Sequence, residues 1–263
     1  MHDFAFIFAG FAVGLIVGLT GVGGGSLMTP LLIFGFGIKP HLAIGTDLLF
    51  AAFTKMGGTV SLARQRVVPW RLVGALSMGS IPAALVTLYV LQELGPANPS
   101  VQKTMTMLLG IALLFTAFAT LYKAIQGKKI PRPITGEKLQ AATRPRHWSL
   151  PVLFGTVIGT LVTLTSVGAG AIGVTALILL YPLLPLPRIV AADIAYAVPL
   201  TLVAGLGHAS LGSVDWPLLG KLLIGSLPGI WLGAQLVQKT PDRLIRSLLS
   251  LLLAYAGVKL IAI

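Results

Sequence analysis

Long apolar segments fill almost the whole chain and constrain its fold more than any other feature. They cover residues 4–20, 26–36, 42–62, 72–91, 103–125, 149–165, 171–184, 189–208, 216–237 and 243–262. A helix that crosses the bilayer core needs roughly 20 apolar residues. Only 10% of the 263 residues are charged, whereas a soluble domain carries about 25%. The sequence therefore predicts an all-α polytopic membrane protein, because only helices satisfy the backbone of such segments in lipid.

One polar stretch, residues 126–148, divides the chain into two halves of similar pattern. This stretch is rich in lysine and arginine, and such residues are typical of cytoplasmic loops. We expect residues 1–125 to be a first transmembrane repeat, residues 126–148 a basic cytoplasmic linker, and residues 149–263 a second transmembrane repeat. Each half begins with a pair of segments broken at glycines, and three full-length helices follow.

The two halves also match in sequence. Residues 20–25 (Thr-Gly-Val-Gly-Gly-Gly) resemble residues 165–170 (Thr-Ser-Val-Gly-Ala-Gly), and Trp70 corresponds to Trp216. Asp47 corresponds to Asp193, and a Gly-Ser-x-Pro turn expected at residues 79–82 is repeated at 225–228. Four matches in one order indicate an internal duplication, which is common in secondary transporters.

The first pair of segments raises the question of direction. Residues 4–36 would span about 50 Å as one helix, so the pair is either a hairpin that returns to its starting side or a broken span that crosses. The hairpin places most of the 19 basic residues on the cytoplasmic side, as the positive-inside rule requires. We therefore predict two inverted repeats, each a Gly-broken re-entrant helix pair plus three transmembrane helices, with both termini outside.

The glycine-rich breaks are the first candidate site. Non-helical backbone at membrane depth survives only when protein or a wet cavity surrounds it, and helix N-termini attract anions. Close packing of helices through small residues is the alternative explanation. The candidate substrate-binding residues of the two breaks are Thr20, Gly21, Gly23, Gly24, Gly25, Ser26, Thr165, Ser166, Gly168 and Gly170.

Ionisable residues within the apolar segments are the second candidate site, because they are costly in a membrane. Lys55 is predicted to face the cavity as a cation for the substrate, although snorkelling to an interface is an alternative. Asp47 and Asp193 are interpreted as N-terminal carboxylates that cap equivalent helices, with proton coupling as the alternative. His208 is expected at a hydrated surface, with a proton-relay role as the alternative.

These motifs resemble the sulfite exporter family, also called the TauE/SafE or toluene sulfonate uptake permease family. The resemblance rests on the glycine-rich residues 21–25 with the following residues 26–31, on residues 45–47 opening the next helix, and on residues 79–82 with their repeat at 225–228. It implies transport of small sulfur oxyanions and organosulfonates, such as sulfite and sulfoacetate. The second half departs from the pattern at Ala169, Ala171 and Thr175, so the site is not expected to be strictly symmetrical.

The leading hypothesis is a secondary transporter of such an anion in the plasma membrane, by alternating access between the repeats. The alternatives are an anion channel or a transporter of another small anion. An enzyme is not expected, because too few carboxylates and histidines lie in the segments for a catalytic cluster. We expect no cofactor, metal or nucleic acid; the net charge of +12 fits basic loops facing anionic lipid. A homo-oligomer is an open alternative.

Overall fold

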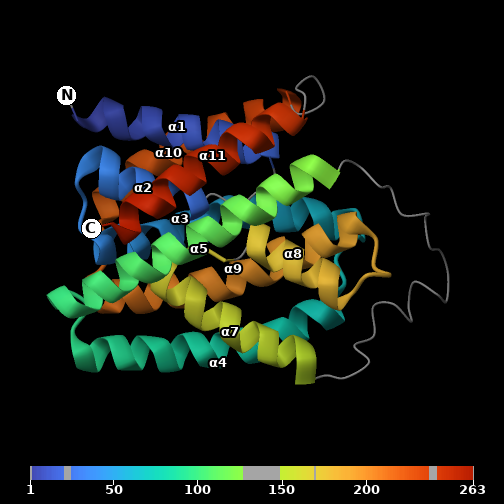
Figure 1. Cartoon of the computed structure of the whole chain (residues 1–263), viewed down its shortest axis with the longest axis horizontal. Helices are drawn as coiled ribbons and strands as arrows, with labels where there is room; N and C mark the ends of the chain where they lie inside the picture. The colour runs from blue at the N-terminus through green and yellow to red at the C-terminus, as the bar shows by residue number, and fades with distance from the viewer. Residues whose placement is uncertain (1, 21–24, 127–148, 169, 237–241, 263) are drawn as a thin grey trace.

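Helices make up nearly all of the computed structural model, which describes every residue except 1, 21–24, 127–148, 169, 237–241 and 263 (Figure 1). Among the described residues no strand occurs, which confirms the all-α prediction. The predicted segments agree with the helices to within about one turn. The helices are α1 (His2–Thr20), α2 (Gly25–Phe36), α3 (Pro40–Arg64), α4 (Trp70–Leu94), α5 (Pro99–Gln126), α7 (Ser149–Thr165), α8 (Ala171–Leu180), α9 (Leu186–Ser210), α10 (Trp216–Leu236) and α11 (Asp242–Ile261).

Three of the described helices are long and apolar enough to cross a membrane: α4, the part of α5 from Pro99 to Tyr122, and α9. Shorter apolar helices lie within α1, α2, α7 and α11. Many large apolar side chains on the outside of the bundle are exposed, among them Phe4, Phe118 and Leu179. Such a surface suits lipid as the solvent.

The turn predicted at residues 79–82 is wrong, and so is its repeat at 225–228. Both stretches lie inside long helices, with Pro82 in the middle of α4 and Pro228 in the middle of α10. Gly79 and Gly225 lie against the backbones of α7 and α1, respectively. The glycine and serine are therefore sites of close helix packing, and a transmembrane helix tolerates the proline that follows.

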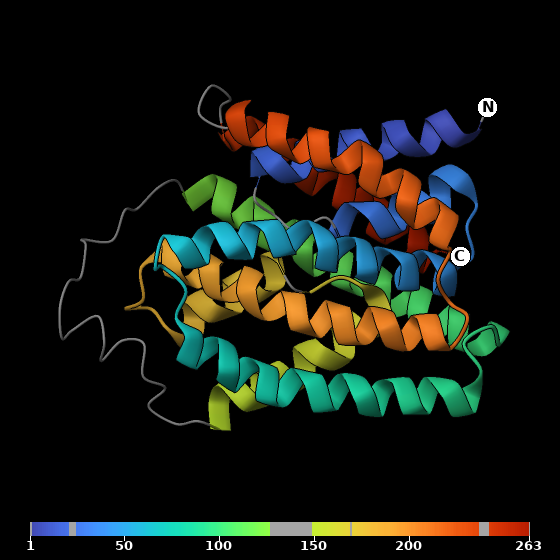
Figure 2. The same ribbon diagram turned by 180° about the vertical axis from the view of Figure 1, so that it is seen from behind.

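The helices pack in pairs that join one half of the chain to the other. The pairs are α1 with α10, α4 with α7, α3 with α9, and α5 with α11. In Figures 1 and 2 the chain begins and ends at the same end of the bundle, where α2 also leads into α3. The α1–α2 pair thus returns to the end where it started, whereas α7 and α8 enter from the opposite end.

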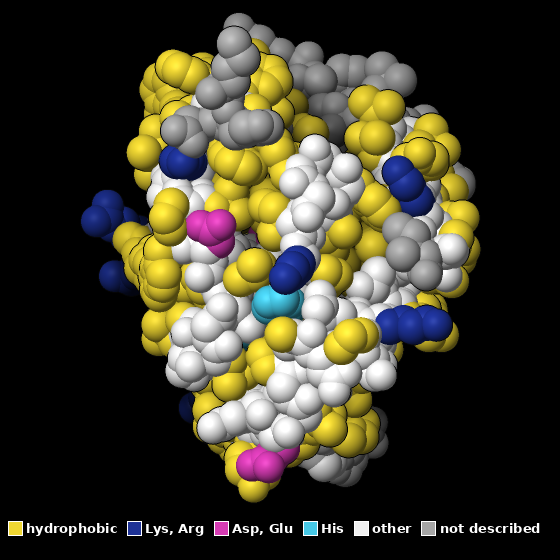
Figure 3. All heavy atoms as spheres, turned by 90° about the vertical axis from the view of Figure 1, so that its left-hand side faces the viewer, with side chains coloured by type: hydrophobic (Ala, Val, Ile, Leu, Met, Phe, Trp, Pro, Cys, Tyr) yellow, Lys and Arg dark blue, Asp and Glu magenta, His cyan; other side chains and the backbone are white. Residues whose placement is uncertain are grey.

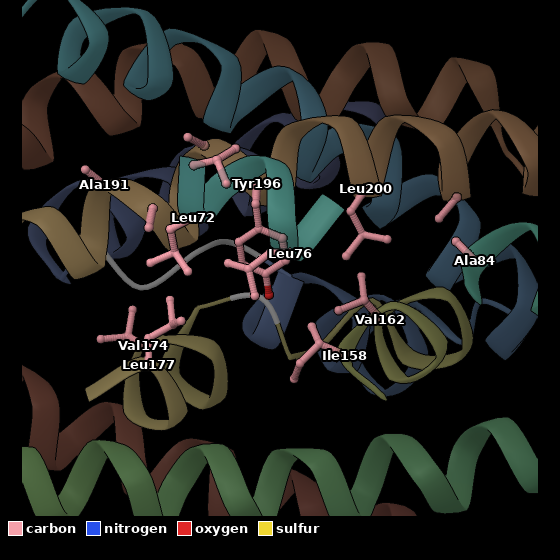
Figure 4. Packing of buried hydrophobic residues seen from close by; sticks show 14 of the residues in the cluster. Leu72, Leu76, Ala84, Ile158, Val162, Val174, Leu177, Ala191, Tyr196 and Leu200 are labelled. Carbon is pink, nitrogen blue, oxygen red and sulfur yellow. The ribbon is translucent and has the colours of Figure 1, made fainter. Parts of the chain in front are cut away.

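Three clusters of buried apolar residues fill the interior among the described residues, and the two largest each combine both halves. The larger includes Leu72 and Leu76 of α4 together with Ile158, Val174 and Tyr196 of α7, α8 and α9 (Figure 4). The other joins α1, α2 and α3 to α10. Each of these two clusters therefore contains the short helix pair and the following long helix of one half, together with the fourth helix of the other half. These are α7, α8, α9 and α4 in the larger cluster, and α1, α2, α3 and α10 in the other. The central helices α3 and α9 hold the candidate site.

Candidate functional site

The two carboxylates predicted as helix caps lie instead in the interior of the bundle. α3 begins after Lys39 and α9 after Pro185, each with a proline in the first two positions. Proline suits these positions because its fixed φ matches the helix and its missing N–H costs nothing there. Asp47 and Asp193 are consequently both seven residues beyond the first helical residue, about 10 Å along the axis. The cap interpretation is wrong, since both carboxylates are two turns too deep.

Asp47 is bound by hydroxyl groups from another helix. Its side chain is fully buried, and the Thr29 hydroxyl of α2 donates a hydrogen bond to Oδ2. Ser166, in the connection between α7 and α8, faces the same carboxyl group without a hydrogen bond of ordinary geometry. Thr29 was not predicted as a site residue, because nothing in its local sequence indicates which side chain of α3 it meets.

Asp193 occupies the corresponding place in the second half. Its carboxyl group lies so close to Gly173, in the first turn of α8, that a Cβ atom there would overlap Oδ1. Asp47 thus lies against α2, and Asp193 lies against α8. The two short helices that follow the glycine-rich breaks therefore both have their N-terminal part next to a buried carboxyl group on a central helix.

Lys55 lies near both carboxylates and is buried, with 8% of its surface exposed. Its strongest charge interaction is with Asp193, and the next is with Asp47. Tyr196 of α9 is fully buried and also lies within electrostatic reach of Asp193. Asp47, Lys55 and Asp193 therefore form one cluster of charges between α3 and α9, which we call the charged cluster.

The second glycine-rich break is well defined. Ser166 has a φ of 59°, and Gly168 and Gly170 have φ values of 138° and 139°. The Gly168 carbonyl accepts a hydrogen bond of 2.9 Å from the Gly173 N–H. The Thr165 hydroxyl binds its own backbone, at 2.6 Å from the Leu161 carbonyl oxygen. Thr165 thereby stabilises the break, and Ser166 is the hydroxyl of this break that faces the charged cluster.

Part of the first break lies outside the described residues, namely Gly21, Gly23 and Gly24. Thr20 is the last residue of α1 and Gly25 the first of α2. Ser26, one residue further on, is buried. The first turn of α2 therefore points its N-terminus into the interior of the protein.

The surface position predicted for His208 is wrong, because the side chain is completely buried. Its Nε2 atom lies 2.9 Å from the Thr163 carbonyl oxygen of α7. Gly45 of α3 lies against the His208 Cβ and the Ser213 carbonyl. The small residue in α3 lets the C-terminal turn of α9 approach closely, and this removes the histidine from solvent.

A groove of about 830 Å³ lies between α4, α5 and α7, and none of its lining residues belongs to the charged cluster. Its lining is apolar apart from a few hydroxyl and amide groups and contains no ionisable side chain. Leu164 forms part of this lining, two residues before Ser166. Such a groove suits hydrocarbon chains rather than an anion.

An all-helical chain that buries a cluster of charges next to broken helices has the architecture of a membrane transport protein. The chain belongs to the sulfite exporter TauE/SafE family, whose sequence model matches residues 6–260. This confirms the resemblance seen in the motifs, and it makes the protein an integral membrane transporter of a small molecule.

Relatives in Bacillus subtilis (strain 168) support the same class. The chain is 36% identical to the probable membrane transporter protein YjnA over 255 residues, which cover 97% of this chain and 98% of that protein. It is 27% identical to the probable membrane transporter protein YdhB, with 95% and 97% covered. It is 28% identical to the probable membrane transporter protein YunE, with 96% and 94% covered. No solved structure matches the chain.

Proposed function

We propose that the protein is a secondary transporter of a small sulfur oxyanion or organosulfonate in the plasma membrane. Its two halves alternate access to a single site between α3 and α9. The family supplies the class of solute, and the charged cluster supplies a location where a charged solute can be held. The substrate is a small anion of the sulfite, sulfonate or sulfoacetate type.

In this proposal residues 1–125 and 149–263 are inverted transmembrane repeats, joined by the cytoplasmic linker 126–148. Reciprocal packing supports this: α1 packs on α10 just as α7 packs on α4, and α3 and α9 pack on each other, as do α5 and α11. When each helix is replaced by the corresponding helix of the other half, the α1–α10 contact becomes the α7–α4 contact. The α3–α9 and α5–α11 contacts remain the same. A two-fold relation between the halves has this property, and it suits a transporter that rocks about its centre.

The observation that carries the proposal is the position of α2 and α8 relative to α3 and α9. The N-terminal parts of both short helices lie next to buried carboxyl groups, at Thr29 in α2 and at Gly173 in α8. Free N–H groups at such helix starts attract anions. The anion would lie at these starts, held by the breaks at residues 20–26 and 165–170, with the hydroxyl groups of Ser26 and Ser166 as further donors.

Lys55 is the proposed cation of the anion site. Burial of an ammonium group is costly without compensating charges, and the nearby carboxylates supply that compensation. An anion that enters the charged cluster would share Lys55 with Asp193. Asp47, Asp193 and His208 are the candidates for coupling transport to protons.

Both termini and the α2–α3, α4–α5 and α9–α10 connections are proposed to face the outside. Figure 3 views the end of the bundle where the termini lie, and basic side chains are spread there among hydrophobic ones. Most of the basic residues belong to the other end or to the linker, which is the proposed cytoplasmic side.

Transport by the purified protein in liposomes would test the function. Sulfite, methanesulfonate, sulfoacetate and sulfate would be offered in turn, with chloride as the control anion. Saturable uptake of a sulfonate or sulfite, together with accelerated exchange when the same anion is present on both sides, is the expected result. Flux that does not saturate and shows no exchange would assign a channel instead, and absence of flux for every sulfur anion would contradict the proposed substrate class.

A further inference from the structure

Asp47 and Ser166 are neighbouring side chains, and each holds a buried polar atom that has no hydrogen-bond partner of ordinary geometry. Oδ1 of Asp47 and Oγ of Ser166 both lack a partner within the described structure, although the two side chains are neighbours. Asp47 belongs to the first half of the chain and Ser166 to the second. Because a buried polar atom without a partner is costly, a proton or a ligand would be stabilised at this pair.

The hydrogen bond from Thr29 decides which carboxyl oxygen atom remains available. The Thr29 hydroxyl donates to Oδ2, so that oxygen is an acceptor. Oδ1 can therefore either accept a hydrogen bond from Ser166 or carry a proton and donate to the Ser166 oxygen. The protonation state of Asp47 thus determines the direction in which the single O–H group of Ser166 points.

The other charges near Asp47 leave the cluster with an excess of negative charge. Lys55 is the charged side chain that acts on Asp47 in the part of the chain that the structure describes, and it interacts more strongly with Asp193. Of the other titratable groups on α9, Tyr196 faces Asp193, and His208 binds α7 through Thr163. Two carboxylates and one ammonium group carry one net negative charge, so an entering anion is repelled.

We propose that Asp47 takes up a proton at Oδ1 when the anion binds, and that this proton crosses the membrane together with the anion. This inference rests on the anion transport proposed above. The proton removes the excess negative charge from the cluster. It also lets Asp47 donate to Ser166, so that the Ser166 O–H group becomes free to donate to the anion. On release, the proton leaves Asp47 to water on the same side as the anion.

Asp47 and not Asp193 carries the proton in this scheme, for two reasons. Lys55 interacts more strongly with Asp193 than with Asp47, so the charge of Asp47 is the less compensated of the two. Asp47 also has the Ser166 hydroxyl of the other half beside it, which can accept a hydrogen bond from that proton. A proton on Asp47 is therefore linked both to the anion and to the relative position of the halves.

The first test needs no substrate. Infrared difference spectra between acid and alkaline pH, recorded on the protein in lipid, report protonated carboxyl groups through their C=O stretch. The variants are Asp47→Asn, which keeps an acceptor for Thr29, and Asp193→Asn and Asp215→Asn for comparison. The expected result is a titrating buried carboxyl band that disappears only in Asp47→Asn. A band that persists in Asp47→Asn and disappears in Asp193→Asn would overturn the assignment.

The second test measures binding of methanesulfonate, whose single charge does not change over the pH range used. Uptake of one proton with each anion makes the affinity fall about tenfold per pH unit above the titration of Asp47. Asp47→Asn is expected to bind methanesulfonate with a pH-independent affinity and to exchange it without pH-driven accumulation, whereas Asp215→Asn keeps the wild-type slope. If folded Asp47→Asn kept the wild-type pH dependence of methanesulfonate affinity, the proposal would be overturned. Asp47→Glu, which keeps a carboxyl group, is the second variant.

The two tests separate this inference from the proposed function. If neither methanesulfonate nor another sulfur anion binds, the substrate class is wrong, yet the infrared test still decides whether Asp47 holds a proton. If the anion binds with an affinity that does not depend on pH, the transporter stands and the proton-carrying role of Asp47 is lost.

Discussion

Gly10 in α1 lies directly against the backbone carbonyl of Leu222 in α10, so close that a Cβ atom on Gly10 would overlap the carbonyl oxygen. Gly155 in α7 has the same relation to the carbonyl of Leu76 in α4. Gly10 and Gly155 are 145 residues apart, as are the two glycine-rich breaks. Leu76 and Leu222 are 146 residues apart, as are Trp70 and Trp216. The two helix crossings are thus built from the same residues, although each joins helices from different halves.

Replacement of either glycine by alanine is therefore expected to destabilise the protein. In Gly10→Ala and Gly155→Ala the added methyl group meets a backbone atom that cannot rotate away, so the helices must separate. Overpacking of this kind typically costs about 1–3 kcal/mol. The melting temperature of the purified protein in detergent would measure the loss.

Gly74→Ala and Gly220→Ala are the matched controls, since they too correspond between the halves and lie on α4 and α10. A Cβ atom at either position meets nothing within 4 Å. Both variants should melt at or above the wild-type temperature, because alanine favours a helix over glycine. Equal stability of all four variants would show that the close crossings do not limit the fold.

Gly168→Val is expected to abolish transport in a protein that still folds. Gly168 has a φ of 138°, which a β-branched residue adopts only with strain. A Cβ atom would also press on Val162 at 3.1 Å, and the resulting shift would move Ser166 away from Asp47. The sequence predicts a similar loss for Gly24→Val. Uptake in liposomes, normalised to folded protein, is the measurement.

Gly37→Val is the control for the effect of backbone strain alone, without a shift of Ser166. Gly37 also has a positive φ, of 67°, but it lies in the exposed α2–α3 connection, where a Cβ atom meets nothing within 4 Å. This variant should lose stability and keep transport. Full transport in both Gly168→Val and Gly24→Val would assign the breaks to helix packing, away from the substrate path.

The helices could be predicted from the sequence because lipid demands long apolar segments, and these are visible without tertiary information. The starts of the helices are harder to predict, and the starts predicted for α3 and α9 are too late. The prolines at residues 40 and 187 begin α3 and α9 earlier than the apolar pattern does. Asp47 and Asp193 therefore looked like caps, although they lie two turns inside their helices.

The partners within the site could not be predicted, because they come from segments far apart in the chain. Thr29 binds Asp47, and Lys55 interacts electrostatically with Asp193 on α9, but no periodicity within α2 or α3 indicates either interaction. The burial of His208 depends on the absence of a side chain at Gly45 in another helix. The sequence therefore indicates which ionisable residues lie within the apolar segments, but not which side chains surround them.

The proposed orientation predicts where introduced cysteines react. The chain contains no cysteine, so single cysteines at positions 138 and 215 can be labelled without background. An impermeant thiol reagent added to intact cells should label position 215 and spare position 138, and opening the cells should expose position 138. Labelling of position 138 in intact cells would overturn the inverted arrangement with external termini.

Lys55→Met tests the charged cluster most directly. The substitution keeps the length and the apolar stem of the side chain and removes its charge. If Lys55 binds the anion, affinity for methanesulfonate should fall by about 1.5–3 kcal/mol, the range for hydrogen bonds to charged groups. The loss should be greater for dianionic sulfoacetate than for methanesulfonate. The sequence alone predicts that folding would be unharmed, but the proximity of Asp193 and Asp47 changes that expectation.

Removal of one partner from a buried charge group typically costs about 3–5 kcal/mol, because the remaining charge is uncompensated. Lys55→Met should therefore lower the melting temperature, and the double variant Lys55→Met/Asp193→Asn should recover most of it. Binding should not recover in the double variant, since the cation for the anion is still missing. The coupling between the two substitutions separates the structural role of Lys55 from its role in binding. Recovery of both stability and anion affinity in the double variant would make Lys55 a structural counter-ion of Asp193, and the anion would then be held by the helix starts and hydroxyl groups alone.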